Sequence, residues 1–368
     1  MIRRQLRRFI KEEVAPYAEQ WELEGQVPRE TLRKLGEMGM LGMRVPEADG
    51  GAGMDALSSV VLAEELGRCT FGGFAVTVLV HTDMATPHLV RYGNPAQKAK
   101  YLPGILRGET ITAICVSEPN AGSDVAGIQT RAERDGDHYV LNGAKMFITN
   151  GVYGDLFFVA AKTDPKLKSK GISMFIVDKN TPGFKASRKL DKHGWRCSDT
   201  AELVFENARV PAENLLGEEN KGFYAIMRNF QNERMVLGAM TVGEASAALD
   251  ITLEHVRTRQ AFGAPLWNKQ AIRQRLSWLA SQVEAGRQLL YHSAWLDARG
   301  EDCVREVSMV KAFCAETLQR VVYDCVQFHG GMGYMRESAI ERMSRDARVQ
   351  PIGGGATEVM LEEVGKRL

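Results

Sequence analysis

The spacing of hydrophobic residues changes twice along the chain, and this limits the folds that it can adopt. Residues 1 to about 110 and residues from about 220 onward carry apolar side chains three and four positions apart, which predicts amphipathic helices. Between them, short runs rich in β-branched and aromatic residues alternate with turn dipeptides. We therefore expect a mainly α protein with a β middle domain: an α-helical N-terminal domain (1–112), a middle domain (113–219) and a C-terminal helical bundle (220–368).

Two turn dipeptides dominate the middle region. Asp135-Gly136 and Asn142-Gly143 are strong hairpin signals and predict strands over 128–134, 138–141 and 145–149. Further strands are predicted over 156–161, 172–177 and 201–205, and these short strands without interleaved helices indicate a small antiparallel barrel or sandwich. In the C-terminal region we predict helices over about 223–260, 271–298 and 304–328, and a short one starting near Thr357.

Charge and composition argue against several classes of protein. The net charge is +1 with both signs interspersed, so we expect no nucleic-acid partner. The longest apolar run, Phe74 to Val80, is far shorter than the ~20 residues of a membrane span. The six cysteines form no CxxC pair and the seven histidines no ligand cluster, so we expect no metal and a reducing compartment. That compartment is the bacterial cytoplasm, or the mitochondrial matrix if a transit segment has been removed.

Two segments of the middle region combine hydroxyls, glycines and an aromatic ring. They are Cys115–Asp124, which reads CVSEPNAGSD, and Lys145–Gly151, which reads KMFITNG. Such residues at a strand end are explained equally well by turn chemistry. They could also wall a flat polar ring, with hydroxyls and backbone amides on its edge and Phe147 against its face.

Two further segments follow predicted helices. Gln327–Tyr334 places three glycines within four residues, which suits either a helix C-cap or close backbone approach by a ligand. Arg257–Gly263 ends a predicted helix, where cations favour the helix dipole, although an arginine near Phe262 could also hold a diphosphate and an adenine. No GxGxxG follows a strand, and neither a phosphate-binding GxxxxGK[ST] loop nor a GxSxG elbow is present.

Taken together, these segments resemble the acyl-CoA dehydrogenase family over nearly the whole chain. SEPNAGSD matches the family's first signature, and Gln327 to Asp346 matches its second. The long-chain and isovaleryl branches are the most similar. The resemblance implies a β-barrel middle domain between two helical domains, and an FAD that lies between the middle and C-terminal domains and is completed by a neighbouring subunit. Near the flavin ring it places Val116, Ser117, Phe147 and Thr149. Ser123 would lie near the ring or the acyl-CoA, and Arg259, Phe262, Gln327 and Gly331 would meet the FAD bound mainly by another subunit.

The chemistry of such an enzyme requires a base for the α-proton of the thioester and flavin N5 as the hydride acceptor. Many members place a glutamate in the loop before the last helix, but the matching position here is Gly354. The long-chain and isovaleryl branches place the base on a bundle helix, just before an arginine, and Glu233-Arg234 matches that position. We therefore expect Glu233 to be the base, with a solvated helix position or an ion pair with a nearby arginine as the alternative. We expect Arg234 to support the substrate site, with a structural ion pair as the alternative. Glu358 is a rival that the helix dipole explains. The N–H of Gly354 would hold the thioester carbonyl together with a ribityl hydroxyl of FAD.

The resemblance implies dehydrogenation of a long-chain or branched-chain acyl-CoA to trans-2-enoyl-CoA, as in fatty acid β-oxidation. An electron-transfer flavoprotein would accept the electrons, and the chain would assemble at least as a dimer and, as most relatives do, as a tetramer, a dimer of dimers. Two alternatives stay open. One is an acyl-CoA oxidase that uses oxygen, and the other is a non-catalytic flavin or CoA-thioester binding homologue, suggested by the missing carboxylate at Gly354.

Overall fold

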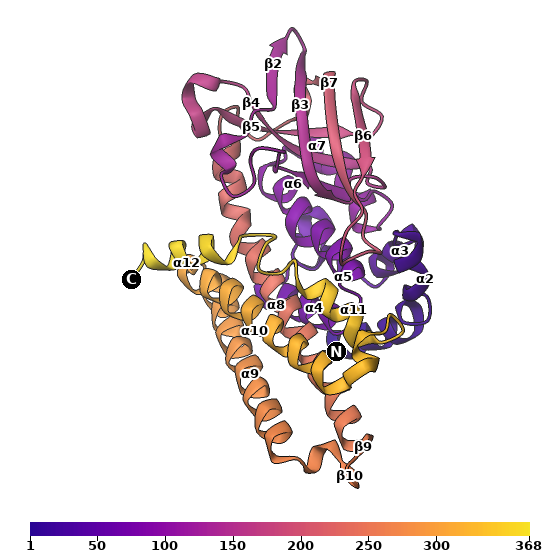
Figure 1. The fold of residues 1–368 in the computed structure, drawn as a ribbon. Coiled ribbons are helices and arrows are strands. Elements are labelled where there is room, and N and C mark those ends of the chain that lie inside the picture. The colour runs from indigo at the N-terminus through magenta and orange to yellow at the C-terminus, as the bar shows by residue number, and fades with distance from the viewer.

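The computed structural model describes all residues 1–368 and has three parts in chain order: helices, a sheet, and helices again (Figure 1). The first part contains seven α-helices and two π-helical turns. Their bounds are α1 Ile2–Phe9, η1 Ile10–Val14, α2 Ala18–Glu24, α3 Arg29–Glu37, α4 Ala56–Gly67, α5 Gly72–Leu79, η4 Val80–Ala85, α6 Thr86–Tyr92 and α7 Pro95–Leu106.

Local chemistry sets the start of α7. The Asn94 side chain accepts a hydrogen bond from Gln97 N at 2.8 Å, and the Gln97 side chain accepts one from Asn94 N at 3.0 Å. This reciprocal capping box satisfies two backbone groups that a helix start leaves free. Pro95 follows at the first helical position, where its missing N–H costs nothing.

The middle part is one sheet, and four of its strands overlap the predicted runs 128–134, 156–161, 172–177 and 201–205. The strands are β1 Thr112–Cys115, β2 Arg131–Asp135, β3 His138–Thr149, β4 Leu156–Lys162, β5 Ile172–Asp178, β6 Phe184–Lys189, β7 Thr200–Pro211 and β8 Leu215–Leu216. Their order is β6-β7-β3-β2-β4-β5-β8, with β1 beside β4.

The predicted β middle domain is confirmed, but its barrel is not closed and its strands are not all antiparallel. The strand path ends at β6 on one side and at the two-residue β8 on the other, and these edges do not pair. β1 also runs parallel to β4, and β2 meets β4 through one parallel residue pair. After β8 the chain leaves the sheet and enters the helix α8 (Gly222–Thr258).

The hairpin predicted at Asn142-Gly143 is also wrong, whereas the one at Asp135-Gly136 is confirmed. β3 runs without a turn from His138 to Thr149, and its register against β7 shifts between Leu141 and Gly143. Gly143 has φ +148, and a Cβ there would lie 2.6 Å from Thr130 Oγ1. The glycine therefore marks a β-bulge that the residue just before β2 approaches closely, not a chain reversal.

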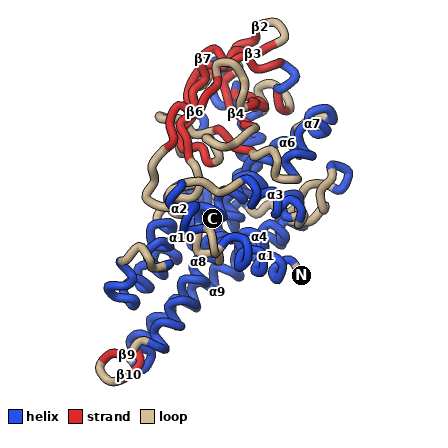
Figure 2. Tube along the Cα trace, turned by 90° about the vertical axis from the view of Figure 1, so that its right-hand side faces the viewer, coloured by secondary structure: helices blue, strands red, loops and turns tan.

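Long helices form the last part, close to the predicted ranges. After α8 come α9 Gln270–Ala298, α10 Val304–His329, α11 Ala339–Ala347 and α12 Thr357–Gly365, with the small β9–β10 hairpin (Gln260–Ala261, Ala264–Pro265) between α8 and α9. The helix α11 and the strand β6 were not predicted. Figure 2 shows the β9–β10 hairpin at the end of the bundle far from the sheet.

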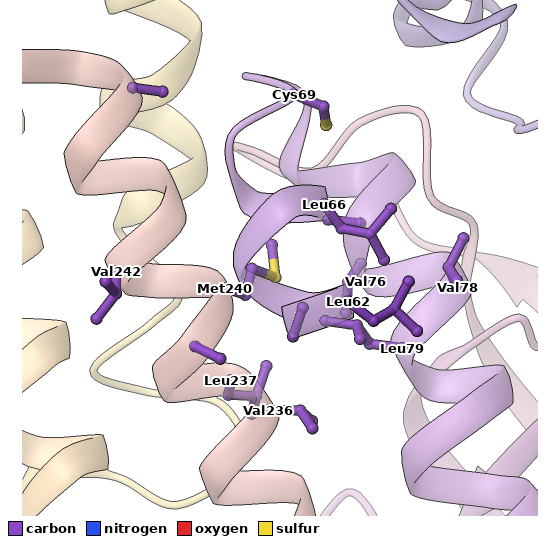
Figure 3. Packing of buried hydrophobic residues seen from close by; sticks show 14 of the residues in the cluster. Leu62, Leu66, Cys69, Val76, Val78, Leu79, Val236, Leu237, Met240 and Val242 are labelled. Atoms are coloured by element: carbon purple, nitrogen blue, oxygen red, sulfur yellow. The ribbon is translucent and has the colours of Figure 1, made fainter. Parts of the chain in front are cut away.

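α8 is the central helix of the molecule. By length and composition it could cross a membrane, but 83% of its most apolar 18-residue stretch is buried inside the protein. Figure 3 shows why: Val236 and Met240 of α8 face Leu62 and Leu66 of α4 in the main hydrophobic core. Apolar residues around the whole helix are thus explained by burial between the N-terminal helices and the bundle.

Candidate functional site

Glu233 lies in the buried first half of α8, with 7% of its surface exposed. Burial raises the pKa of Glu233 to about 7, while a hydrogen bond from Asn229 and the nearby Arg234 guanidinium oppose the rise. A carboxyl group with such a pKa exchanges protons near neutral pH, which suits a general base.

The loop that contains Gly354 packs against the same stripe of α8. A Cβ on Gly354 would lie 2.1 Å from Leu237 Cδ1, and Leu237 follows Glu233 by one helical turn. Gly354 has φ +64 and is exposed, so its backbone is accessible to a ligand beside α8. The structure therefore places Gly354 against α8 one helical turn from Glu233, although 121 positions separate the two residues in the sequence.

Arg234 lies under this loop. Its guanidinium is 5.6 Å from the centre of the Phe230 ring, and its Nε is buried without a hydrogen-bond partner. A Cβ on Gly355 would lie 3.4 Å from that Nε. Burial lowers the pKa of Arg234 from its usual value, but Arg234 remains a cation at any physiological pH.

Lys311 of α10 binds backbone carbonyl groups of the loop that contains Gly354. The sequence patterns did not identify this lysine. Its Nζ donates to the carbonyl oxygens of Gln350 and Gly355, the latter at 3.2 Å. Burial and the neighbouring Arg234 lower the pKa of Lys311 to about 8. The one available signal was a lysine on an otherwise apolar helix face, and that signal could not name its partners.

A second group of predicted residues lies at the end of β1 and on β3. Ser117 O accepts a hydrogen bond from Met146 N at 2.9 Å, and Val116 O accepts one from Lys145 Nζ at 3.1 Å. Lys145 also pairs with Glu118 at 2.7 Å in the protein interior. These bonds hold Val116 and Ser117 beside the strand that carries Phe147 and Thr149.

The geometry of this second group suits a flat aromatic ligand. Phe147 is 69% exposed and has φ 62, an uncommon backbone conformation for a bulky residue. Thr149 and Ser117 lie at the half-buried rim beside it, and Ser123 is on the exposed loop that follows Glu118. An exposed ring in a strained conformation beside hydroxyl groups is typical of a ligand-binding surface.

The turn η4 links this surface to Glu233. It contacts β1 on one side and α8 on the other, so the ends of β1 and the base candidate lie on opposite sides of a single short segment. A cleft of about 670 Å³, lined mainly by residues 118–120, 128–131 and 142–144, contains neither Glu233 nor Gly354.

The remaining predicted residues lie elsewhere. Arg259, Phe262, Gln327 and Gly331 are exposed at the far end of the bundle, where His255 of α8 stacks on His329 of α10 with ring centres 4.2 Å apart. Arg259 follows Glu233 by 26 positions, which corresponds to about 40 Å along an α-helix. Figure 1 shows the β9–β10 hairpin, which begins directly after Arg259, at the opposite end of the molecule from β3, the strand that contains Phe147.

Fold and site together define a three-domain protein with an acidic base candidate beside a surface for an aromatic cofactor. Family models for acyl-CoA dehydrogenases match the chain throughout: the N-terminal domain at residues 1–109, the middle domain at 113–208 and the C-terminal domain at 220–368. The chain belongs to the acyl-CoA dehydrogenase family.

Individual relatives agree with this assignment. An acyl-CoA dehydrogenase of Bacillus subtilis is 39% identical over 100% of this chain and 97% of its own length. The mitochondrial long-chain specific acyl-CoA dehydrogenase of Rattus norvegicus is 39% identical over 100% of this chain and 86% of its own. The isovaleryl-CoA dehydrogenase of Pongo abelii is also 39% identical, over 99% of this chain and 87% of its own length. The crystal structure of an acyl-CoA dehydrogenase from Geobacillus kaustophilus superposes with a TM-score of 0.96 at 42% identity, covering 100% of this chain and 97% of that one.

The chain is therefore an oxidoreductase that acts on CH–CH bonds, and it is an FAD enzyme like the rest of its family. The predicted resemblance, the three-domain fold and the cofactor are confirmed. The fit of the surface around Phe147 to a flat ring is the feature of this chain that agrees with FAD.

Proposed function

We propose that this chain dehydrogenates a long-chain or branched-chain acyl-CoA to its trans-2-enoyl-CoA, with Glu233 as the base. The proposal depends on one observation above all: Glu233 is a buried carboxylate one helical turn from Leu237, against which the Gly354 loop packs. Position 354 itself offers no side chain, and Glu233 is the buried carboxyl group on the stretch of α8 that this loop contacts.

In the proposed reaction, the thioester lies between the Gly354 loop and the surface around Phe147. Glu233 takes the α-proton, and the electron pair of that C–H bond forms the new double bond as the β-hydrogen leaves as a hydride. Bound FAD supplies the hydride acceptor, and Val116, Ser117, Phe147 and Thr149 would hold its ring. The N–H of Gly354 would hold the thioester oxygen as negative charge develops on it, and Ser123 and Arg234 would contact the substrate.

The substrate class is proposed from the relatives, because Leu237 Cδ1 already occupies the volume beside Gly354, 2.1 Å from where a Cβ would lie. The relatives named for long-chain and isovaleryl substrates are consistent with both possibilities. We further propose an electron-transfer flavoprotein as electron acceptor, and a tetramer in which Arg259, Phe262, Gln327 and Gly331 of one subunit complete the FAD site of another.

An anaerobic titration of the yellow protein with acyl-CoA thioesters tests the proposal. The panel contains straight chains of increasing length and branched chains such as isovaleryl-CoA and citronellyl-CoA, and the readout is loss of flavin absorbance. We expect rapid bleaching by long or branched members and none with Glu233→Gln. No bleaching by any thioester, with FAD still bound, would favour a binding protein. Stoichiometric peroxide formation in air at a rate equal to turnover would favour an oxidase.

A further inference from the structure

Asn229 connects the base candidate to the N-terminal domain. It lies on α8 one turn before Glu233 and is 1% exposed. Its Nδ2 donates to Glu233 Oε1 at 3.1 Å and lies 3.2 Å and 3.0 Å from the carbonyl oxygens of Asp83 and Met84. The amide thus faces the carboxylate and the turn η4 at once.

The carbonyl group of Asp83 is available because the backbone of this segment is irregular. In an α-helix Asp83 O would accept from the N–H of residue 87, but residue 87 is a proline and has none. The chain instead forms the π-helical turn η4 at Val80–Ala85 before α6 begins. Turns of this kind are frequent at functional sites, because they present carbonyl groups sideways.

The other end of the Asn229 amide is fixed as well. Its Oδ1 accepts a hydrogen bond from Arg91 of α6 at 3.2 Å. Since a guanidinium can only donate, the oxygen of the amide must face Arg91, and the NH₂ group must face Glu233. Arg91 therefore decides which way Asn229 points.

We propose that Asn229 is a positioning residue for Glu233, which orients the carboxylate and stabilises its charged form through the chain Arg91–Asn229–Glu233. This inference rests on the proposed role of Glu233 as base. An N–H donor favours the carboxylate over the carboxylic acid, so the bond partly offsets the effect of burial. In addition, a hydrogen bond to one oxygen restricts the rotation of the carboxyl group and so helps to keep it directed toward the α-carbon.

Other charged groups surround the pair and must be considered in its titration. Arg234 adjoins Glu233 on the same helix, and its charge favours the carboxylate. From η4, the Asp83 carboxylate faces α8, but Ser59 and Thr82 each donate to it at 2.6 Å. From the segment before α4, Arg44 donates to Asn232 and to Asp297.

Asn232 provides a matched control. Its Nδ2 also donates to Asp83 O, at 2.8 Å, and its Oδ1 also accepts from an arginine, Arg44. It is 4% exposed and lies on the same helix, but it makes no hydrogen bond to Glu233. Loss of Asn232 therefore removes an equivalent link between α8 and η4 without touching the base.

The test is the pH dependence of flavin reduction at low substrate concentration, which reports ionisations of the free enzyme. The holoenzyme is mixed anaerobically with the acyl-CoA that bleaches the wild type fastest. The acidic limb of the pH–rate profile is the range in which the rate rises as Glu233 loses its proton. In Asn229→Ala this limb should move to higher pH by about one unit. Reduction at pH 6 should then be roughly tenfold slower than in wild type, with a smaller loss at pH 9. Asn232→Ala should keep the wild-type limb.

A second variant covers the case in which Asn229→Ala loses FAD or fails to fold. Asn229→Asp has nearly the same shape but cannot donate, and it places another anion beside Glu233, so its limb should move further up than that of Asn229→Ala. A wild-type limb in either variant, or the same shift in Asn232→Ala, would overturn the inference. Glu233→Gln separates the two proposals: if it still reduces flavin, the base assignment fails, whereas an inactive Glu233→Gln with an unshifted Asn229 variant refutes the positioning role alone.

Discussion

Leu237 Cδ1 occupies the place where a side chain at position 354 would begin, 2.1 Å from the Cβ that Gly354 lacks. With φ +64 at Gly354, the loop and α8 have closed over the volume that a loop carboxylate would require. The proposed base on α8 and the Leu237 side chain that fills the space beside Gly354 therefore depend on the same packing of the loop against α8.

Replacing Gly354 with alanine should destabilise the protein by about 2–4 kcal/mol, from the strained φ and from overpacking against Leu237. Urea unfolding followed by circular dichroism measures the change. Gly136→Ala is the matched control, because Gly136 also has a positive φ (+62) but a Cβ there meets nothing within 4 Å. Equal losses in the two variants would contradict the packing argument, and Leu237→Ala should recover part of the loss at 354.

Glu233→Gln should abolish flavin reduction yet stabilise the fold at high pH. The pKa of Glu233 is raised by burial to about 7, so the folded state binds its proton more tightly than the unfolded state. The stability that this proton contributes is complete below about pH 4.5 and is lost as the pH rises through 7. Glutamine is neutral throughout, so the variant should gain on the order of 3 kcal/mol over wild type at pH 8 and little at pH 4.

Unfolding free energies of the wild type and Glu233→Gln at pH 4, 6 and 8 provide the check. Glu363→Gln serves as a control, because Lys366 and Arg367 lower the pKa of that carboxylate instead of raising it. A difference between Glu233→Gln and wild type that does not grow with pH would show that Glu233 is not buried as a neutral acid.

Lys311→Met should lower the rate of flavin reduction more than it weakens FAD binding. The substitution removes the donor shared by Gln350 O and Gly355 O and leaves two carbonyl groups in the interior without this partner. Each such group costs about 1–3 kcal/mol, which the loop can recover only by moving away from α8. Stopped-flow reduction rates and FAD retention after gel filtration separate the two effects, with the exposed Lys366→Met as reference. Unchanged reduction rates would remove Lys311 from any part in positioning Gly354.

Phe147→Ala should weaken FAD binding and leave the protein otherwise folded. The ring is 69% exposed, so its removal costs the apoprotein little packing, whereas a flavin ring would lose its aromatic neighbour. FAD release on dilution, followed by flavin fluorescence, is the measurement. The exposed ring of Tyr17, far from β3, provides a control in Tyr17→Ala. Identical FAD retention in both variants would refute the proposed flavin surface.

The long elements could be predicted because each depends on its own residues. α8, α9 and α10 lie close to the ranges expected from apolar spacing, and the Asp135-Gly136 turn depends only on two residues. Asn142-Gly143 has the same local signature but forms a bulge, because Thr130, just before β2, lies against Gly143. That contact is tertiary and leaves no trace in the local sequence.

The site divides in the same way. Glu233 and Gly354 could be singled out from motif positions, but their proximity depends on how the loop packs against Leu237. Asn229 and Lys311 escaped detection because they bind backbone carbonyl groups, at Asp83 and Met84 and at Gln350 and Gly355. Every residue type has such a carbonyl, so no sequence pattern marks the acceptor.

The continuity of α8 has a consequence for how this chain can change length in evolution. The helix carries Glu233 in its first half and ends at Thr258, directly before Arg259. One inserted residue between them would turn everything beyond it by about 100° and advance it by about 1.5 Å. Insertions should therefore accumulate at the Asp135–Asp137 turn or between α9 and α10, while this stretch of α8 keeps a constant number of residues.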